Sequence, residues 1–401
     1  MTNIASKLNL QIFLKFEIYL ILILPVALIT GPAIPDIIIT LLAISYLFKK
    51  NFLKKIYEFK EINFLSLMFL SMLFTYSINF NLLDFINTFI FIRFFLFIFN
   101  ACEIFQSNKK IFIYFLNIYL LTYIFEIIDV VIQYFRHYDL FGFPSVYFKD
   151  LNLYRLSGTF GDELVVGSYL CKSLPIVIYA LFSNYKLNKY LILLITIISI
   201  GVIYLTAERG PFLLSLIFFF LICYALIEKK IMALSVIIFL FVIYFITRSD
   251  FLLINNIISY LINFQESSYY ELYKNSILVF GENPFLGGGH RAFENICPTL
   301  INLDNKLSFD QCSTHPHNYY LEVLNSYGLK SVIFLILFYL LIVYKFFILE
   351  YKRYDKVLIS GVIMVFFPLA TSSSLFNNNW NMCVIATLLM VFQKVINENK
   401  I

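Results

Sequence analysis

Long apolar runs follow one another along most of the chain, with short polar connections between them. A helix needs about 20 apolar residues to cross the hydrocarbon core, because lipid cannot satisfy free backbone N–H and C=O groups. Roughly twelve runs fit this length, so we predict one all-α bundle of transmembrane helices over residues 1–401. The predicted spans are 12–30, 34–48, 62–78, 85–105, 111–134, 164–182, 190–206, 211–227, 231–247, 318–347, 357–375 and 380–396.

Lysine and arginine collect in every second connection, as in residues 49–55 and 352–356. Basic residues in short loops are retained on the cytoplasmic side of a membrane. We therefore predict that both termini are cytoplasmic and that the long connections 135–163 and 248–317 face outward. The short outward connections 31–36, 79–84 and 376–379 contain no Lys or Arg.

Apolar residues make up 61% of the chain and charged residues only 14%, which excludes an ordinary soluble globular domain. The lysine-rich connections account for the net charge of +5, so this charge is a topology signal. Nucleic-acid binding requires a basic face, and the chain has no such cluster outside those connections. We therefore predict a membrane protein that does not bind nucleic acid.

All four histidines fall in the two long outward connections. His315 and His317 flank a proline, and Asn318 follows them directly before a long apolar run. Imidazole has an ordinary pKa of about 6.5, which suits a general base near neutral pH. We therefore expect the chemistry of this protein at this cluster, on the outer face, and we expect His137 to be structural.

The six cysteines divide into two groups. Cys297 and Cys312 share the large outward connection, where an oxidising periplasm favours a disulfide, and the sequence leaves open whether they are bridged. The other four are expected to pack within predicted spans as small apolar side chains. They are Cys102, Cys171, Cys223 and Cys383.

Three short motifs in the second half of the chain carry a family resemblance. Residues 283–289 read Asn-Pro-Phe-Leu-Gly-Gly-Gly, and a gap of nine residues separates His317 and Asn318 from Gly328. This arrangement resembles the signature of the O-antigen ligase and O-antigen polymerase superfamily, although Ser331 stands where the ligase pattern has Gly, Thr or Tyr. The glycine run lacks the Lys-Ser of a phosphate-binding loop, so we expect it to form a flexible loop or to permit a close backbone approach.

Two further segments extend the resemblance to about residues 150–395. Residues 206–210, Thr-Ala-Glu-Arg-Gly, are similar to a family element that contains Glu-Arg-Gly. Residues 155–160, Arg-Leu-Ser-Gly-Thr-Phe, and the Gly-Ser-Tyr at 167–169 resemble a segment of many polymerases. This segment and the Ser331 departure favour a polymerase over a ligase.

The resemblance implies a multi-pass protein of the bacterial inner membrane with the second GT-C structural class (GT-C class B-like) and a periplasmic active site. The implied donor is a glycan on undecaprenyl diphosphate, held among membrane lipid. The acceptor is another lipid-linked repeat for a polymerase, or the lipid A core for a ligase. No cofactor and no metal are implied, and a chain-length regulator is a candidate partner.

Glycan transfer from a lipid diphosphate needs cations near the leaving group, and arginine meets phosphate oxygens with two donors at once. Arg209 is the first candidate, because it is the only basic residue in its short outward connection. The topology rule places basic residues in the cytoplasmic connections instead. Arg155 and Arg291 are the next candidates for diphosphate binding. Each of them can instead be an ordinary helix-end or loop charge.

His317 is the expected catalytic base, because the motif histidine of the family aligns with it. Asn318 or Glu322 is expected to orient its imidazole, and His315 is the second candidate. Each histidine can also be an ordinary loop or helix-capping residue.

Other interpretations stay open. Asp162 and Glu163 form the best candidate metal pair, although acids at this position also suit a helix start. Asp139 and Asp150 are further outward carboxylates. A flippase for lipid-linked glycans is the main rival, but it usually has two matched halves, which this chain lacks. A glycan-binding assembly subunit without catalysis is the third interpretation.

Overall fold

A computed structural model describes residues 2–49, 61–77, 81–148, 153–227, 262–304 and 312–398. These residues are mostly helical, and they include one two-stranded antiparallel sheet of β1 (Val146–Phe148) and β2 (Leu153–Arg155). The predicted span 231–247 and Asp150 lie outside the described residues.

Helices occupy all or most of the other predicted spans except 357–375, because the apolar runs leave the backbone no other way to satisfy its polar groups. In the first half they are α1 (Thr2–Ala27), α2 (Ala33–Leu47), α4 (Asn63–Phe74), η1 (Thr75–Ser77), α5 (Leu82–Ile90), α6 (Ile92–Ser107), α7 (Lys109–Arg136), η3 (Gly158–Phe160), α8 (Val166–Ser183) and α9 (Lys189–Leu205). In the second half they are α10 (Arg209–Leu226), η4 (Phe264–Glu266), α13 (Ser268–Glu282), α14 (Ala292–Asp304), α15 (Tyr319–Phe347), α16 (Arg353–Val365) and α17 (Asn379–Glu398).

Six helical segments of the described chain are long and apolar enough to cross a bilayer. They are Leu82–Ser107, Lys109–Arg136, Val166–Ser183, Arg209–Leu226, Tyr319–Phe347 and Asn379–Glu398. Shorter apolar helices occur at Ala33–Leu47, Asn63–Ser77 and Lys189–Leu205. Large apolar side chains remain exposed on several of these helices, as lipid-facing surfaces require. The described residues thus give six candidate spans against an expectation of about twelve.

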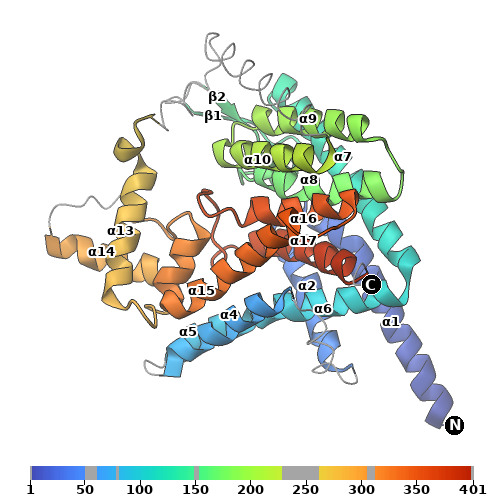
Figure 1. The fold of residues 1–401 in the computed structure, drawn as a ribbon, viewed down its shortest axis with the longest axis horizontal. Helices are drawn as coiled ribbons and strands as arrows, with labels where there is room; N and C mark the ends of the chain where they lie inside the picture. Colours follow the sequence, from blue (N-terminus) through green and yellow to red (C-terminus); the bar gives the residue numbers. More distant parts are fainter. Residues whose placement is uncertain are drawn as a thin grey trace.

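The helices stack in three tiers (Figure 1). One tier contains α7 to α10, the middle tier contains α15, α16 and α17, and the third contains α2, α4, α5 and α6. Contacts of α10 and α8 with α16 join the first two tiers, and contacts of α4 with α15 and of α6 with α17 join the last two. The helix α13 packs with α14 at one end of the bundle.

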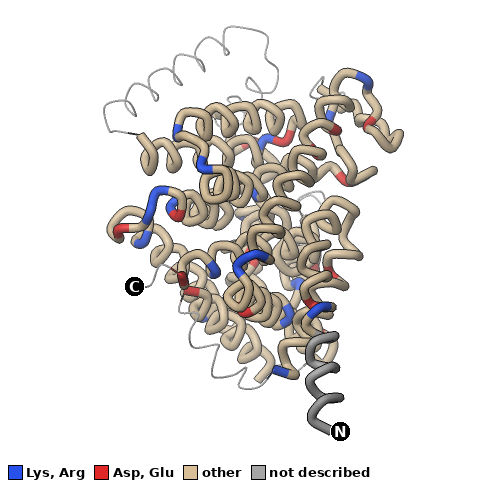
Figure 2. The backbone as a smooth tube through the Cα atoms, turned by 90° about the vertical axis from the view of Figure 1, so that its right-hand side faces the viewer, with Lys and Arg blue, Asp and Glu red and all other residues tan. Residues whose placement is uncertain are grey.

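Alternate connections meet at opposite ends of the bundle. Charged residues are sparse along the backbone tube (Figure 2), and Lys109 at the start of α7 lies 3.8 Å from Glu398 at the end of α17. At the other end, the Trp380 indole N–H at the start of α17 donates to the carbonyl of Leu28, just after α1, at 2.8 Å. The two ends of α17 therefore mark opposite ends of the bundle, one beside the start of α7 and the other beside the end of α1.

Charged residues inside the predicted spans face the protein interior, as expected from their cost in lipid. Arg93 pairs with Asp36 at 2.8 Å. Glu126 and Asp129 are fully buried and accept hydrogen bonds from the loop that follows α7. Lys172 is also buried. Each of these charged side chains therefore has polar protein groups as neighbours inside the bundle.

The predicted span 357–375 is wrong in its second half, because α16 ends at Val365 and residues 366–378 form an irregular loop. We call this segment the site loop. Apolar residues before Pro368 extend the hydrophobic pattern past the end of the helix. Pro368 has no N–H to donate, and the hydroxyl groups of residues 371–374 compete for backbone hydrogen bonds, so the helix does not continue.

A kink in α15 receives the glycine-rich loop. Gly328 has φ 72° and ψ −176°, which interrupts the helix and frees carbonyls of the preceding turn. The N–H of Gly288 donates to Asn325 O at 2.8 Å, and the N–H of Gly289 donates to Ser326 O at 2.9 Å. The close backbone approach expected for this glycine run is therefore confirmed.

Gly328→Ala is expected to destabilise the protein, because the added Cβ would collide with the carbonyl of Phe285 and because φ 72° is strained for alanine. Such backbone strain costs about 1–3 kcal/mol before any collision is counted. The melting temperature of the purified protein in detergent measures the effect. Gly201→Ala is the control, since Gly201 lies in α9 with nothing within 4 Å of an added Cβ. Equal melting temperatures for the two variants would contradict the role of the kink.

Candidate functional site

Glu322 of α15 holds the site loop in place. Its side chain is buried, its Oε2 accepts the N–H of Leu375 at 2.8 Å, and the hydroxyl of Ser374 donates to Oε1. The same hydroxyl oxygen accepts the N–H of Phe376 at 3.0 Å. One buried carboxylate thereby satisfies backbone groups that the irregular loop leaves without helical partners.

His315 and His317 lie against each other, next to the site loop. Their ring centroids are 4.1 Å apart, and the N–H of Ser372 in the site loop donates to His317 O at 2.8 Å. The ring of Tyr269 on α13 meets His317 edge-on at 5.6 Å. His317 also has φ 53°, a left-handed conformation that is uncommon for residues with a side chain. Such strain persists where the surrounding contacts enforce it.

Both imidazoles are neutral near pH 7. Burial lowers the pKa of His317 below its ordinary value, against a hydrogen bond with the Ser372 backbone that raises it. Burial and the neighbouring imidazole lower the pKa of His315 to about 4. His315 Nδ1 lies 3.0 Å from Thr314 Oγ1, and its Nε2 is buried without a hydrogen-bond partner among the described residues. A neutral imidazole can accept a proton, so both meet the first requirement of a base.

Asn318 and Glu322 were expected to orient an imidazole, but in the structure both bind backbone groups. Asn318 Oδ1 caps α15 by accepting the N–H groups of Tyr320 at 3.0 Å and Leu321 at 3.2 Å. Its Nδ2 donates to Pro368 O in the site loop at 2.7 Å. The motif asparagine therefore joins the start of α15 to the site loop.

Asn377 in the site loop connects Arg291 to the histidine segment. Arg291 Nε donates to Asn377 Oδ1 at 3.0 Å, and Asn377 Nδ2 donates to the carbonyl of Thr314 at 3.1 Å, one residue before His315. Arg291 also lies 3.8 Å from Glu294. Asn377 was not predicted from the sequence, although three consecutive asparagines at 377–379, between two apolar runs, were an available signal.

Arg209 approaches the opposite part of the site loop. It is half-buried at the first position of α10, and Ala207 before it has φ 59°. A Cβ on Gly210 would lie 2.8 Å from Thr371 Oγ1, so the start of α10 touches the site loop one residue before Ser372. A helix N-terminus and a guanidinium both favour an anion at this place.

Arg155 lies close enough to Glu208 for their charges to interact. Glu208 is buried and its Oε1 accepts the N–H of Gly167 at 2.6 Å. Burial raises the pKa of Glu208 to about 7, although the positive charge of Arg155 opposes this shift. The Arg155 guanidinium lies over the ring of Phe148 at 5.4 Å, and its Nε is buried without a hydrogen-bond partner among the described residues. Arg155 therefore keeps a donor that the fold itself does not use.

A buried polar layer supports the site loop from α8 and α17. Lys172 Nζ donates to Ser168 Oγ at 2.8 Å and to Asn381 Oδ1. Asn381 Nδ2 donates to the carbonyl of Ser374 at 2.9 Å and to the hydroxyl of Tyr319 at 3.1 Å. The intramembrane lysine is thus joined to the site loop through a single asparagine.

Cys297 and Cys312 form a disulfide, with their Cα atoms 5.8 Å apart. The bridge joins α14 to the segment that leads into His315, so it restrains the approach to the histidine pair. The other cysteines are buried in the helices, which agrees with their predicted packing role.

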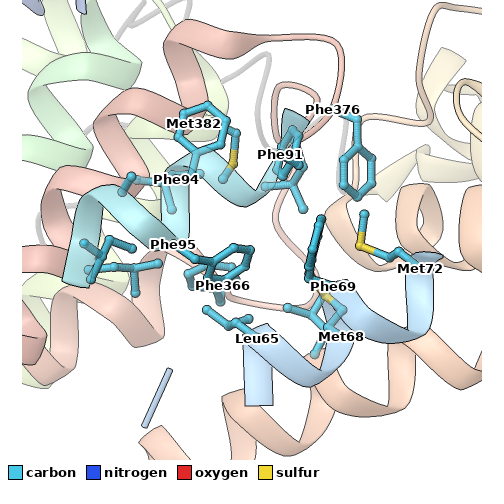
Figure 3. A pocket seen from close by; sticks show the side chains of 16 residues that line it. Leu65, Met68, Phe69, Met72, Phe91, Phe94, Phe95, Phe366, Phe376 and Met382 are labelled. Carbon is cyan, nitrogen blue, oxygen red and sulfur yellow. The ribbon is translucent and has the colours of Figure 1, made fainter. Parts of the chain in front are cut away.

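An apolar cavity borders the site loop at Phe366, Leu375 and Phe376 (Figure 3). Phenylalanine and methionine side chains of α4, α6 and α17 form much of its lining. Its volume is about 40 Å³, little more than the roughly 30 Å³ share of one water in the liquid. The cavity is therefore a packing void and too small for a lipid chain.

The carboxylates considered as metal ligands are not gathered together. Asp162 and Glu163 are exposed. Asp139 Oδ1 accepts the N–H groups of Phe141 and Phe143 in its own turn. In the part of the chain that the structure describes, three or more His, Cys, Asp or Glu side chains do not meet in a metal-binding arrangement.

Comparison with known families gives one match. The family model described as O-antigen ligase matches residues 194–336. The matched residues include Arg209, Arg291, the histidine pair and Gly328, whereas Arg155 and the site loop lie outside them. A search of curated proteins found no match. The family match confirms the resemblance seen in the sequence motifs.

Replacing Cys297 and Cys312 by serine is expected to lower the melting temperature, because a bridge across 15 residues is worth about 3 kcal/mol. Alkylation before a non-reducing gel should show both thiols protected in the wild type. Reductant should lower the melting temperature of the wild type and leave that of the double variant unchanged. Free reaction of both thiols in oxidised membranes would contradict the bridge.

Proposed function

We propose that this chain, which a family model described as O-antigen ligase matches over residues 194–336, is a membrane glycosyltransferase that transfers a glycan from undecaprenyl diphosphate to a sugar hydroxyl. One observation carries the proposal: the site loop touches the helix start that bears Arg209, the side chain of Arg291 and the backbone of His317. The site loop thereby brings together cations that can bind a diphosphate and a neutral imidazole that can act as a base.

In the proposed reaction, the acceptor hydroxyl oxygen attacks the anomeric carbon of the donor sugar. The bond from that carbon to the diphosphate oxygen breaks, and undecaprenyl diphosphate leaves with the electron pair. His317 takes the hydroxyl proton, because its lowered pKa keeps it neutral. The guanidinium groups of Arg209, Arg155 and Arg291 stabilise the negative charge of the leaving diphosphate. The proposed reaction uses neither a metal nor another cofactor.

Three features support Arg209 and Arg155 as the main diphosphate ligands. Both side chains are half-buried, which strengthens their interaction with an anion. The N-terminus of α10 beside Arg209 favours an anion through its helix dipole, and Arg155 retains a buried donor. Arg291 is more exposed and already binds Asn377, so it is the third candidate.

We place the site on the periplasmic face of a bacterial inner membrane, with both termini in the cytoplasm. The lysine-rich connections in the sequence support this orientation, because basic residues in short loops are retained on the cytoplasmic side. A disulfide in the histidine-bearing loop agrees with an oxidising compartment on the other side.

Polymerisation of lipid-linked repeats is our preferred reaction. The Arg155 segment that resembles polymerases contributes to the site, since Arg155 interacts with Glu208 beside Arg209. Ser331 departs from the ligase pattern, and its hydroxyl lies 2.8 Å from that of Ser71 on α4. Transfer to the lipid A core is the second candidate, favoured by the description of the matched family.

Labelled lipid-linked repeats, given to the purified protein with and without lipid A core, separate these reactions. Sizing the products on a gel should show a ladder of longer lipid-linked glycans without the core. Product that forms only when the core is present would establish the ligase instead. Absence of any transfer to either acceptor would refute the proposed function.

His317→Asn is expected to abolish product formation, since loss of a positioned base commonly costs about 10²–10⁴ in rate. Asparagine tolerates the left-handed backbone of this position, so the variant should fold. His137→Asn is the matched control, because His137 is also left-handed and lies at the end of α7.

Wild-type activity should fall as pH drops through the His317 pKa, with a midpoint below the ordinary value of about 6.5. Normal product from His317→Asn would shift the role to His315, and loss of wild-type activity with a chelator would indicate a metal.

Arg209→Ala is expected to weaken turnover by a factor of about 10 to 150, which corresponds to the roughly 1.5–3 kcal/mol of a hydrogen bond to a charged group. Arg209→Lys should recover only part of the activity, because lysine cannot donate two parallel bonds. Arg136→Ala removes an exposed arginine from the end of α7 and should leave turnover unchanged. Near-normal activity of Arg209→Ala at normal protein level would transfer the role to Arg155.

A further inference from the structure

Tyr76, Asp84 and His290 form a second polar cluster next to Arg291, outside the proposed donor site. Tyr76 belongs to η1, Asp84 to the first turn of α5, and His290 to the glycine-rich loop. The Tyr76 hydroxyl accepts the N–H of His290 at 3.1 Å. A Cβ on Gly289 would lie 3.7 Å from Asp84 Oδ2 and 3.9 Å from the Tyr76 ring. The glycine lets these groups come together, and we call them the Asp84 cluster.

Two members of this cluster keep unused hydrogen-bonding capacity. The side chain of His290 is 8% exposed, and its Nδ1 has no hydrogen-bond partner among the described residues. The half-buried carboxylate of Asp84 has neither a side-chain hydrogen bond nor an ion pair within the same residues. The nearby cation of Arg291 is directed to Asn377 and Glu294 instead. Buried polar groups are normally paired, so this cluster is suited to bind a polar ligand.

The chemistry of the Asp84 cluster favours a neutral ligand with several hydroxyl groups. The carboxylate can accept short, charge-assisted bonds from hydroxyls, and it would repel a diphosphate. Burial and the charge of Arg291 lower the pKa of His290 to about 4, so its imidazole is neutral and can exchange a hydrogen bond with a hydroxyl. The same arginine disfavours a cationic ligand. A sugar satisfies all three conditions.

The cluster lies at the end of the site loop opposite to Arg209. Phe376 of the site loop packs edge-on against Tyr327 at 5.0 Å, and the Tyr327 hydroxyl reaches that of Tyr76 through Thr88 Oγ1. Thr371, near the other end of the loop, packs against Gly210 beside Arg209. The histidine segment contacts the loop at two points. The N–H of Ser372, next to Thr371, donates to His317 O, and the side chain of Asn377, next to Phe376, donates to Thr314 O.

We infer that Asp84 and His290 form the subsite that binds the acceptor sugar, through hydroxyl groups other than the one that attacks. This inference rests on the proposed glycosyl transfer, and it names the element of the fold that receives the second substrate. Tyr76 is a positioning residue, since its hydroxyl fixes the backbone of His290. The donor diphosphate and the acceptor sugar then approach the histidine pair from opposite ends of the site loop.

The test measures transfer kinetics with the full-length protein in detergent. The donor is a labelled undecaprenyl-diphosphate-linked repeat, and the soluble acceptor is the free repeat oligosaccharide released from its lipid by mild acid, with lipid A core in a parallel series. Asp84→Asn and His290→Ala should each raise the KM for the acceptor by about 10-fold to 100-fold while donor affinity stays unchanged. Asp84→Glu should recover part of the loss. Glu282→Gln, the same chemical change at an exposed carboxylate just before the glycine-rich loop, is the control.

Three results would overturn the inference. An unchanged acceptor KM in Asp84→Asn, with an active wild type, would refute this subsite and leave the proposed transfer intact. If Asp84→Asn weakened donor binding as much as acceptor binding, the cluster would be assigned to the donor instead of the acceptor. A wild type that transfers to neither acceptor would refute the proposed function and this inference with it. A fluorescent derivative of the free repeat oligosaccharide allows its binding affinity to be measured for the wild type and for Asp84→Asn, even where turnover is low. Equal affinities of the two proteins would again refute the subsite.

Discussion

Irregular backbone within a bundle of membrane helices depends on protein groups to replace the water that lipid excludes. The site loop meets this constraint with partners from two flanking helices. Glu322 and Asn318 of α15 bind its N–H and carbonyl groups, and Asn381 of α17 binds the carbonyl of Ser374. The arrangement of Arg209, Arg291 and the histidine pair rests on these bonds, because their segments meet at the site loop.

The helical architecture could be predicted because long apolar runs report directly on a requirement of the bilayer. The same reasoning placed Arg93 and Lys172 toward the interior, where the structure pairs them with Asp36 and Asn381. It was wrong for residues 366–375, because a hydropathy pattern records the environment of a segment and contains little information on its backbone. Pro368 and the hydroxyl residues after it were the signals that the helix ends early.

The candidate site was predictable where a motif supplied the residues. His317, Asn318 and Gly328 follow a recognisable spacing, and the structure gives each position a physical reason: a left-handed backbone, a helix cap and a kink. Partners that come from distant segments could not be predicted, because their proximity depends on the packed fold. The hydrogen bond between Tyr76 and His290 joins residues that are 214 positions apart, and neither residue predicts the other.

The order of the elements along the chain has a consequence for biogenesis. The two arginine-bearing turns and the histidine segment are synthesised before the site loop and α17, which hold them together. A nascent chain that has inserted only as far as α15 therefore carries its charged groups without the segment that brings them together. Until α17 is in place, the carbonyl of Ser374 in the site loop lacks the amide donor of Asn381. The geometry of the early segments thus depends on a helix that is synthesised after all of them.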